Sequence, residues 1–300
     1  MCSISKISRA YALDIMKASY INQEFFMKVL VTGAEGLLGR DVCKVFSQQG
    51  YAVKPFSHAA LDITSVENVT RVLNEEKPEV VIHCAAYTNV DAAENDFETA
   101  CRVNEKGTQN VASWCAENDA TLVYISTDYV FYGGLERAYK PEDTTNPINK
   151  FGESKRLGEE VVKRTCKKYY IVRTSWLYGD KPHNFVTDLI AASNNAQLQV
   201  VDDQKGSPTW TCDVALALIK ILKEKPFGIY HACNSGATTW YGLAVKLYDL
   251  LGVKLNLKPC TSDLLRNRVA KRPVQSVLDN GGLCRPWEEA LADFVNTLKQ

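Results

Sequence analysis

Short apolar runs alternate with amphipathic stretches from residue 27 onward. The runs are rich in β-branched residues, as expected for buried strands, and lie at 28–31, 51–53, 80–82, 122–125 and 170–172. Apolar residues at helical spacing separate them, over about 37–46, 65–76, 104–118 and 154–167. Strands that alternate with helices pair in parallel through right-handed crossovers. The pattern predicts an α/β fold, a Rossmann-like doubly wound parallel sheet.

This alternation loosens after residue 176. Apolar patterning there predicts helices near 185–193, 212–222, 241–251 and 287–298, and short strands at 198–201 and 228–231. We expect residues 27–175 to form the Rossmann-like domain, with parts of 198–231 adding to it. Residues 176–197 and 232–300 are expected to form a smaller C-terminal lobe that covers a ligand cleft.

Residues 1–26 are expected to be an extension outside the core. They lack the apolar run of a secretory signal, and Asp14 and Glu24 argue against a transit peptide. A chain starting at Met27 should therefore keep its melting temperature and ligand affinity, because the extension shows no apolar periodicity that would dock it onto a sheet. Thermal unfolding of both chains checks this, and a drop of many degrees would show that the extension packs on the domain.

Composition excludes several classes of protein. The 300 residues are 46% apolar and 23% charged, with 35 basic and 35 acidic side chains. This balance provides no electrostatic surface for nucleic acid or an anionic membrane. No apolar run approaches the roughly 20 residues of a transmembrane helix.

The ten cysteines are spread along the chain without a Cys-x-x-Cys pair. Most have apolar neighbours, which indicates small buried hydrophobic side chains in a reducing, cytoplasmic compartment. Zinc requires clustered cysteine and histidine ligands, and the four histidines are scattered. We therefore predict no metal.

A glycine-rich turn joins the first strand to the first helix. Gly33, Gly36 and Gly39 follow a Gly-x-x-Gly-x-x-Gly spacing, typical of short-chain dehydrogenases and of their extended branch in particular. Glycines permit a tight turn and a close backbone approach to a pyrophosphate, which the helix N-terminus attracts. We predict an NAD(P)-binding domain, with Leu37 and Leu38 opening the helix at the anion. An ordinary βα turn is the alternative.

The second strand is followed by a segment without an acidic residue. An acid there would bind the ribose 2′-hydroxyl of NAD, whereas a base would accept the 2′-phosphate of NADP. Lys54, Ser57 and His58 could serve a phosphate. The sequence therefore favours NADPH, with NADH as the alternative.

Several longer motifs resemble one family. They are 126–131 (STDYVF), 146–155 (NPINKFGESK), 173–179 (RTSWLYG), 271–273 (KRP), 276–279 (SVLD) and 286–289 (PWEE). Together they resemble dTDP-4-dehydrorhamnose reductase, an extended short-chain dehydrogenase/reductase, from Met27 to the C-terminus. The resemblance implies NADPH-dependent reduction of dTDP-4-dehydro-L-rhamnose to dTDP-L-rhamnose in polysaccharide biosynthesis. The resemblance is also compatible with a homodimer.

The resemblance implies a catalytic set with one departure. Thr127 matches the residue that hydrogen-bonds the carbonyl oxygen, and Lys155 matches the lysine that binds the ribose and lowers the pKa of a tyrosine. That tyrosine would stand four residues earlier, one helical turn away, where this chain has Phe151. General acid catalysis contributes about 10²–10⁴-fold, so Phe151 implies impaired reduction or a protein that only binds.

Further positions carry expectations from the same resemblance. Asp62 and Ile63 match the segment at the adenine, and Ala85, Ala86 and Tyr87 match the loop beside the nicotinamide ribose. Asn104 matches a structural asparagine or, alternatively, is a helix N-cap. Tyr129, Trp176 and Arg272 are expected near the sugar and diphosphate, with core aromatics and a surface arginine as the alternatives. Thr239 and Trp240 resemble a lobe segment over the substrate.

Two other functions compete with reduction. A regulatory subunit such as the β subunit of methionine adenosyltransferase shares this fold and binds NADP, and Phe151 favours that class. An epimerase of the same branch is the third class, although it also relies on the tyrosine. The motifs at 173–179 and 272–280 fit the reductase better.

Overall fold

A computed structural model describes residues 27–194, 197–254, 256–264 and 268–299. The expectations for residues 1–26 lie outside these described residues. Throughout the described part of the chain, every helix is too short or too polar to cross a lipid bilayer.

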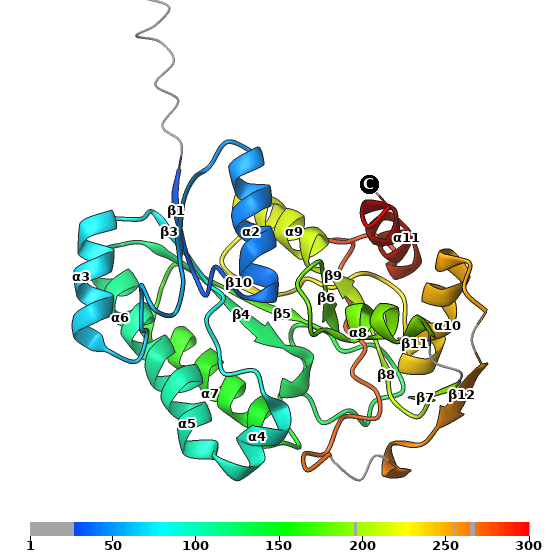
Figure 1. The fold of residues 1–300 in the computed structure, drawn as a ribbon. Coiled ribbons are helices and arrows are strands. Elements are labelled where there is room, and N and C mark those ends of the chain that lie inside the picture. The colour runs from blue at the N-terminus through cyan, green and yellow to red at the C-terminus, as the bar shows by residue number, and fades with distance from the viewer. Residues whose placement is uncertain (1–26, 195–196, 255, 265–267, 300) are drawn as a thin grey trace, which may run out of the picture.

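A parallel sheet of six strands forms the centre of the molecule (Figure 1). Its strands, in the order β2, β1, β3, β4, β5, β10, are Ala52–Phe56, Lys28–Thr32, Val80–His83, Thr121–Thr127, Tyr169–Thr174 and Gly228–His231. The chain winds outward from β1 to β2 and then returns to β3 on the other side of β1. Ligands of such sheets bind at the carboxyl ends of the strands, where the winding reverses. The predicted fold is confirmed.

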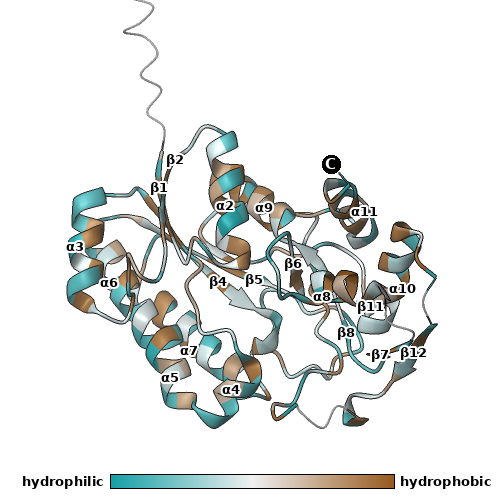
Figure 2. Cartoon of the chain, in the orientation of Figure 1, coloured by the Kyte–Doolittle hydropathy of each residue, from teal (hydrophilic) through white to brown (hydrophobic). Residues whose placement is uncertain are grey.

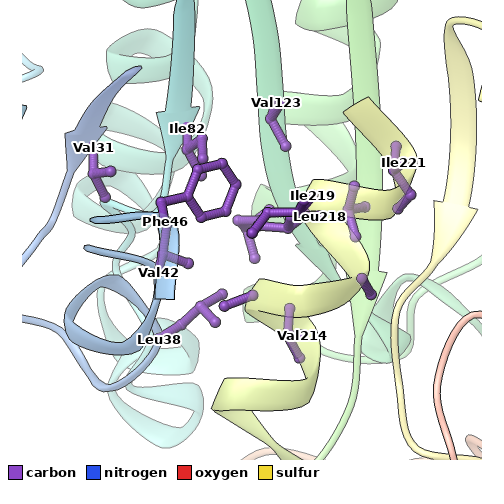
Figure 3. Packing of buried hydrophobic residues seen from close by; sticks show 14 of the residues in the cluster. Val31, Leu38, Val42, Phe46, Ile82, Val123, Val214, Leu218, Ile219 and Ile221 are labelled. Atoms are coloured by element: carbon purple, nitrogen blue, oxygen red, sulfur yellow. The ribbon is translucent and has the colours of Figure 1, made fainter. Parts of the chain in front are cut away.

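Helices cover both faces of this sheet. Helices α2 (Leu37–Gln48) and α9 (Thr211–Glu224) pack on one face, around Val42, Phe46 and Leu218 (Figure 3). Helices α3 (Val66–Glu76), α6 (Thr108–Glu117) and α7 (Lys150–Thr165) cover the other. Hydrophilic and hydrophobic residues alternate along α2 and α3, as their amphipathic sequences require (Figure 2).

The smaller lobe follows β5. It contains α8 (Phe185–Ala191), α10 (Trp240–Leu251), α11 (Trp287–Thr297) and three pairs of short strands. The pairs are β7 (Gln197–Val201) with β12 (Asn256–Cys260), β6 (Leu177–Tyr178) with β9 (Thr209–Trp210), and β8 (Lys205–Gly206) with β11 (Thr238–Thr239). Its helices share a core that includes Leu247 and Phe294.

Two helical regions differ from the sequence prediction. Helix α7 begins at Lys150 rather than near 154, because the Asn149 side chain accepts a hydrogen bond from the Gly152 amide and caps it. Helices α4 (Val90–Asn95) and α5 (Phe97–Cys101) were not predicted. The helix predicted over 104–118 begins as a π-helix, η1 (Arg102–Gly107), and continues as α6. Short 3₁₀ turns complete the structure: η2 (Asp128–Val130), η3 (Ala192–Asn194) and η4 (Ser262–Leu264).

Candidate functional site

Two of the three glycines in the first turn are required by packing. Gly33 has φ +64°, and a Cβ atom there would lie 2.7 Å from the Ala85 amide nitrogen. A Cβ at Gly39 would lie 2.2 Å from the Gly33 carbonyl oxygen. These contacts bring β1, α2 and the chain after β3 together at the carboxyl edge of the sheet.

Gly36 is constrained differently. Its φ of −68° suits any residue, and a Cβ would be 3.0 Å from the Gly33 oxygen, a tight distance that small shifts could relieve. It precedes Leu37 and Leu38 at the start of α2, where no side chain caps the helix. The first amides of α2 are therefore available to an anion. This uncapped, glycine-lined turn fits the pyrophosphate of a dinucleotide.

Acidic side chains lie near Lys54 and His58, two of the residues expected near a 2′-phosphate. Lys54 Nζ lies 3.2 Å from a Glu76 carboxylate oxygen, and His58 Nε2 lies 4.0 Å from Asp62 Oδ1. Hydrogen bonds from the Thr64 amide and hydroxyl lower the pKa of Asp62. Ser57, the third residue expected there, is uncharged and makes no ionic contact with the described side chains.

The loop after β3 is held by Asn104. The Asn104 side chain accepts from the Tyr87 amide at 2.8 Å, donates to the Tyr87 carbonyl at 3.0 Å, and donates to Ser154 Oγ at 2.9 Å. Asn104 lies inside η1, so the helix N-cap interpretation is wrong. Asn104 thereby links η1 to the loop that carries Ala85, Ala86 and Tyr87. Ile63 is buried beside Gly107, the last residue of η1.

Two neighbouring elements at the carboxyl edge of the sheet, β4 and α7, carry Thr127, Phe151 and Lys155. Thr127 ends β4 and caps η2 by accepting from the Tyr129 amide. Helix α7, which contacts both β4 and η2, carries Phe151 and Lys155 one turn apart on its buried side. The Phe151 ring meets the Tyr129 ring edge-on, with centroids 6.0 Å apart.

Lys155 is buried, with its Nζ 4.2 Å from the centroid of the Tyr124 ring. Burial lowers the pKa of Lys155 to about 7, although the charges of Glu159 and Cys84 oppose this shift. A lysine in this state binds a hydroxyl either as donor or as acceptor near neutral pH.

His83 is a buried residue that no sequence pattern singled out. Its ring nitrogens contact Thr32 Oγ1 at 2.7 Å and Thr108 Oγ1 at 3.3 Å. Burial, reinforced by Lys155, lowers the pKa of His83 to about 3, so the ring is neutral at physiological pH. It fixes the ends of β1 and β3 beneath the site.

A buried ion pair anchors α7 behind Lys155. Glu159 accepts two hydrogen bonds from Arg173, at 2.8 and 2.7 Å, and one from Ser126 at 2.6 Å. Both ionic side chains are almost fully buried. The pair ties α7 to β4 and β5, and sequence spacing carried no sign of it.

Replacing Arg173 with methionine is expected to lower the free energy of unfolding by about 3–5 kcal/mol, because Glu159 would remain as an uncompensated buried charge. Denaturant unfolding measures this. Arg71→Met, which breaks the exposed pair with Glu75, is the matched control and should have little effect. Equal losses in the two variants would contradict the stabilising role of the buried pair.

The segment after β5 and the start of α10 each carry a tryptophan. Trp176 stacks on Trp240 with ring centroids 3.5 Å apart and an interplanar angle of 4°. Trp176 has φ +46°, which is rare for a bulky residue and is maintained by the surrounding packing. Trp240 also donates to Gln204, and Thr239 caps α10. Thus Trp176 and Trp240 form one aromatic pair.

Arg272 makes a bidentate contact with Asp91 of α4, at 2.7 Å for each oxygen. Asp91 therefore occupies the face of the guanidinium that was expected to clamp a diphosphate. The contact joins the segment around Arg272 to α4, and Asn149 binds the Lys271 carbonyl nearby. Asp91, whose pKa is lowered to about 2 chiefly by Arg272, is an acceptor that sequence analysis missed.

A cleft of about 940 Å³ lies beside this segment. Its lining includes Arg268, Lys271 and Arg272 together with residues 132–136 and Gln204. These three basic side chains outnumber the two acids of the lining, Glu136 and Asp263, and this excess of positive charge suits an anionic ligand. Among the described residues no group of three or more histidine, cysteine, aspartate or glutamate side chains could hold a metal ion.

The winding of the sheet and the uncapped glycine turn define a dinucleotide-binding protein of the Rossmann type. Residues 27–300 match the family model described as the RmlD substrate binding domain. The dTDP-4-dehydrorhamnose reductase of Streptomyces griseus is 41% identical over 284 residues, which cover 90% of this chain and 93% of that protein. The chain therefore belongs to the dTDP-4-dehydrorhamnose reductase family.

Solved structures agree with this assignment. The dTDP-4-dehydrorhamnose reductase of Clostridium acetobutylicum superposes with a TM-score of 0.88 and 40% identity, covering 91% of this chain and all of that one. The enzyme of Bacillus anthracis, solved in complex with NADP, gives a TM-score of 0.87 and 38% identity, covering 90% of this chain and 99% of that one.

Proposed function

We propose that this protein is an NADPH-dependent reductase that converts dTDP-4-dehydro-L-rhamnose into dTDP-L-rhamnose for polysaccharide biosynthesis. The observation that carries the proposal is that α7, which bears Lys155, packs on β4, which ends at Thr127, in a sheet whose first turn leaves the start of α2 uncapped. The names of the relatives support the reaction, because those from Streptomyces griseus and Clostridium acetobutylicum are reductases of this substrate.

Each residue of the site has a distinct task in this proposal. The bound cofactor supplies a hydride. The Thr127 hydroxyl donates a hydrogen bond to the keto oxygen, and Lys155 binds the ribose of the cofactor. Phe151 stands where the family resemblance places a proton-donating tyrosine, so the site has lost one acid and kept its other groups.

NADPH is the preferred cofactor in this proposal. The segment after β2 carries no acid to bind a ribose 2′-hydroxyl, and Ser57 and His58 lie at the end of that strand. The Bacillus anthracis relative was solved with NADP. Adenine is assigned to Asp62 and Ile63, and the nicotinamide ribose to residues 85–87.

The diphosphate of the nucleotide sugar is assigned to the cleft of about 940 Å³ beside Arg272, and the sugar to aromatic side chains. Tyr129 lies against Phe151, and the stacked pair of Trp176 and Trp240 offers an apolar surface to a deoxysugar. Arg268 and Lys271 are the cations assigned to the diphosphate, since Asp91 holds the fork of Arg272.

A regulatory subunit that binds NADP without reducing a sugar is the second candidate, favoured by Phe151. Incubation of the protein with NADPH and dTDP-4-dehydro-L-rhamnose separates the two. The proposal expects cofactor oxidation that depends on the sugar nucleotide and is lost in Lys155→Ala. Tight NADPH binding without oxidation would favour the regulatory subunit.

A further inference from the structure

A carboxyl group is buried directly beside Thr127. Asp128 is 2% exposed and begins η2. Thr127 Oγ1 donates to Asp128 Oδ1 at 3.0 Å. The other oxygen, Oδ2, is buried and makes no hydrogen bond within the described part of the chain. Among the described residues, no cation forms an ion pair with this carboxyl, and its charged form is stabilised by hydrogen bonds alone.

The surroundings of Asp128 favour its protonated form. Burial raises the pKa of Asp128 to about 7, although the hydroxyls of Ser276 and Thr127 and backbone amides oppose the shift. The titratable groups that face it are Tyr129 on the same segment and Cys233 after β10, and both have pKa values raised by burial. Arg272, the nearby cation, faces Tyr129 and pairs with Asp91.

The hydrogen-bonding capacity of Thr127 makes this carboxyl chemically useful. A hydroxyl has one donor and two acceptor positions. The Tyr129 amide occupies one acceptor position at 3.1 Å. If Asp128 is ionised, the Thr127 proton points at Asp128. If Asp128 is protonated, its O–H donates to the second acceptor position, and the Thr127 proton is free for a ligand oxygen.

We propose that Asp128 and Thr127 form a proton relay that supplies the proton for carbonyl reduction in this chain. The inference rests on the proposed reductase function. Lys155 is the competing donor, but its Nζ lies over the Tyr124 ring and its assigned task is the ribose.

The relay accounts for every proton and electron of the reduction. As the carbonyl carbon accepts a hydride, the π electrons of the C=O bond move to the oxygen. That oxygen takes the proton of Thr127, and Thr127 takes the proton of Asp128. The ketone becomes an alcohol, the reduced nicotinamide becomes oxidised, and Asp128 is left as a carboxylate that recovers a proton from solvent.

Infrared spectroscopy of the protein alone tests the protonation of Asp128. We expect a carboxylic acid C=O band that disappears as the pH rises through about 7 and is absent from Asp128→Asn. Asp119→Asn, which changes an exposed carboxylate, is the matched control and should keep the band. A spectrum without this band below pH 6, or an unchanged band in Asp128→Asn, would overturn the relay.

A double-mutant cycle tests the role in reduction. Asp128→Asn should lower the rate of single-turnover reduction by about 10²-fold in the wild-type background. In the Phe151→Tyr background, Asp128→Asn should lower the rate of single-turnover reduction less than about threefold, because the tyrosine then supplies the proton. The rate of the wild-type protein should also fall above pH 7, as the Asp128 carboxyl loses its proton.

The outcomes separate the relay from the function on which it rests. Equal losses from Asp128→Asn in the two backgrounds would show a structural role and overturn the relay alone. Failure of every variant, including Phe151→Tyr, to reduce the sugar nucleotide would overturn the reductase proposal together with the relay. Thermal unfolding at pH 8 is the folding control, because the amide introduced by Asp128→Asn can still accept from Thr127.

Discussion

Phe151→Tyr is expected to raise kcat by about 10²-fold with little change in KM. The tyrosine hydroxyl would lie one helical turn from Lys155, whose positive charge favours its ionised form. General acid catalysis spans about 10²–10⁴-fold, and a direct phenolic donor should exceed the two-step relay through Thr127. An acid used in the transition state adds little ground-state binding, so KM should change little. Steady-state kinetics with the sugar nucleotide measures the change.

Phe97→Tyr is the matched control for this substitution. Phe97 belongs to the same apolar cluster as Phe151, and the change adds the same single oxygen. We expect kcat to stay near the wild-type value, because Phe97 is on α5, whereas Thr127 and Lys155 are on β4 and α7. A wild-type protein as fast as Phe151→Tyr would contradict the assignment of position 151 as the missing acid.

Gly36→Val is expected to abolish NADPH binding while the protein stays folded. The backbone at Gly36 accepts any residue, but a valine side chain would occupy the space at the start of α2 where a pyrophosphate must approach. Gly33 and Gly39 cannot serve in this test, because a Cβ at either would strike the backbone. Fluorescence titration with NADPH measures the loss.

A graded series makes the result for Gly36 specific. Gly36→Ala adds one methyl group and should weaken binding less than Gly36→Val does. Both variants should unfold within a few degrees of wild type. Unchanged NADPH affinity in a folded Gly36→Val protein would refute the assignment of this turn as the cofactor site.

The sheet and the glycine turn after its first strand could be predicted because their signals are local. A buried parallel strand is a continuous apolar run, and Gly33, Gly36 and Gly39 stand together between the first strand and the first helix. Motifs with several adjacent residues carried the family resemblance, which the comparisons confirmed.

The remaining parts of the site depend on contacts between distant residues. Arg272 and Asp91 are 181 positions apart, and apolar periodicity does not pair them. The start of α7 was missed because a single capping side chain, Asn149, decides it. The π-helix around Asn104 was missed because sequence periodicity does not distinguish one inserted residue from a regular α-helix.

Transfer of deuterium tests the central claim most directly. The wild-type protein is incubated with NADPH deuterated at the transferable C4 position and with dTDP-4-dehydro-L-rhamnose, and the product is examined by mass spectrometry and NMR. The reductase account predicts dTDP-L-rhamnose with deuterium at C4 of the sugar. Recovery of unchanged substrate from a protein that demonstrably binds NADPH would contradict it.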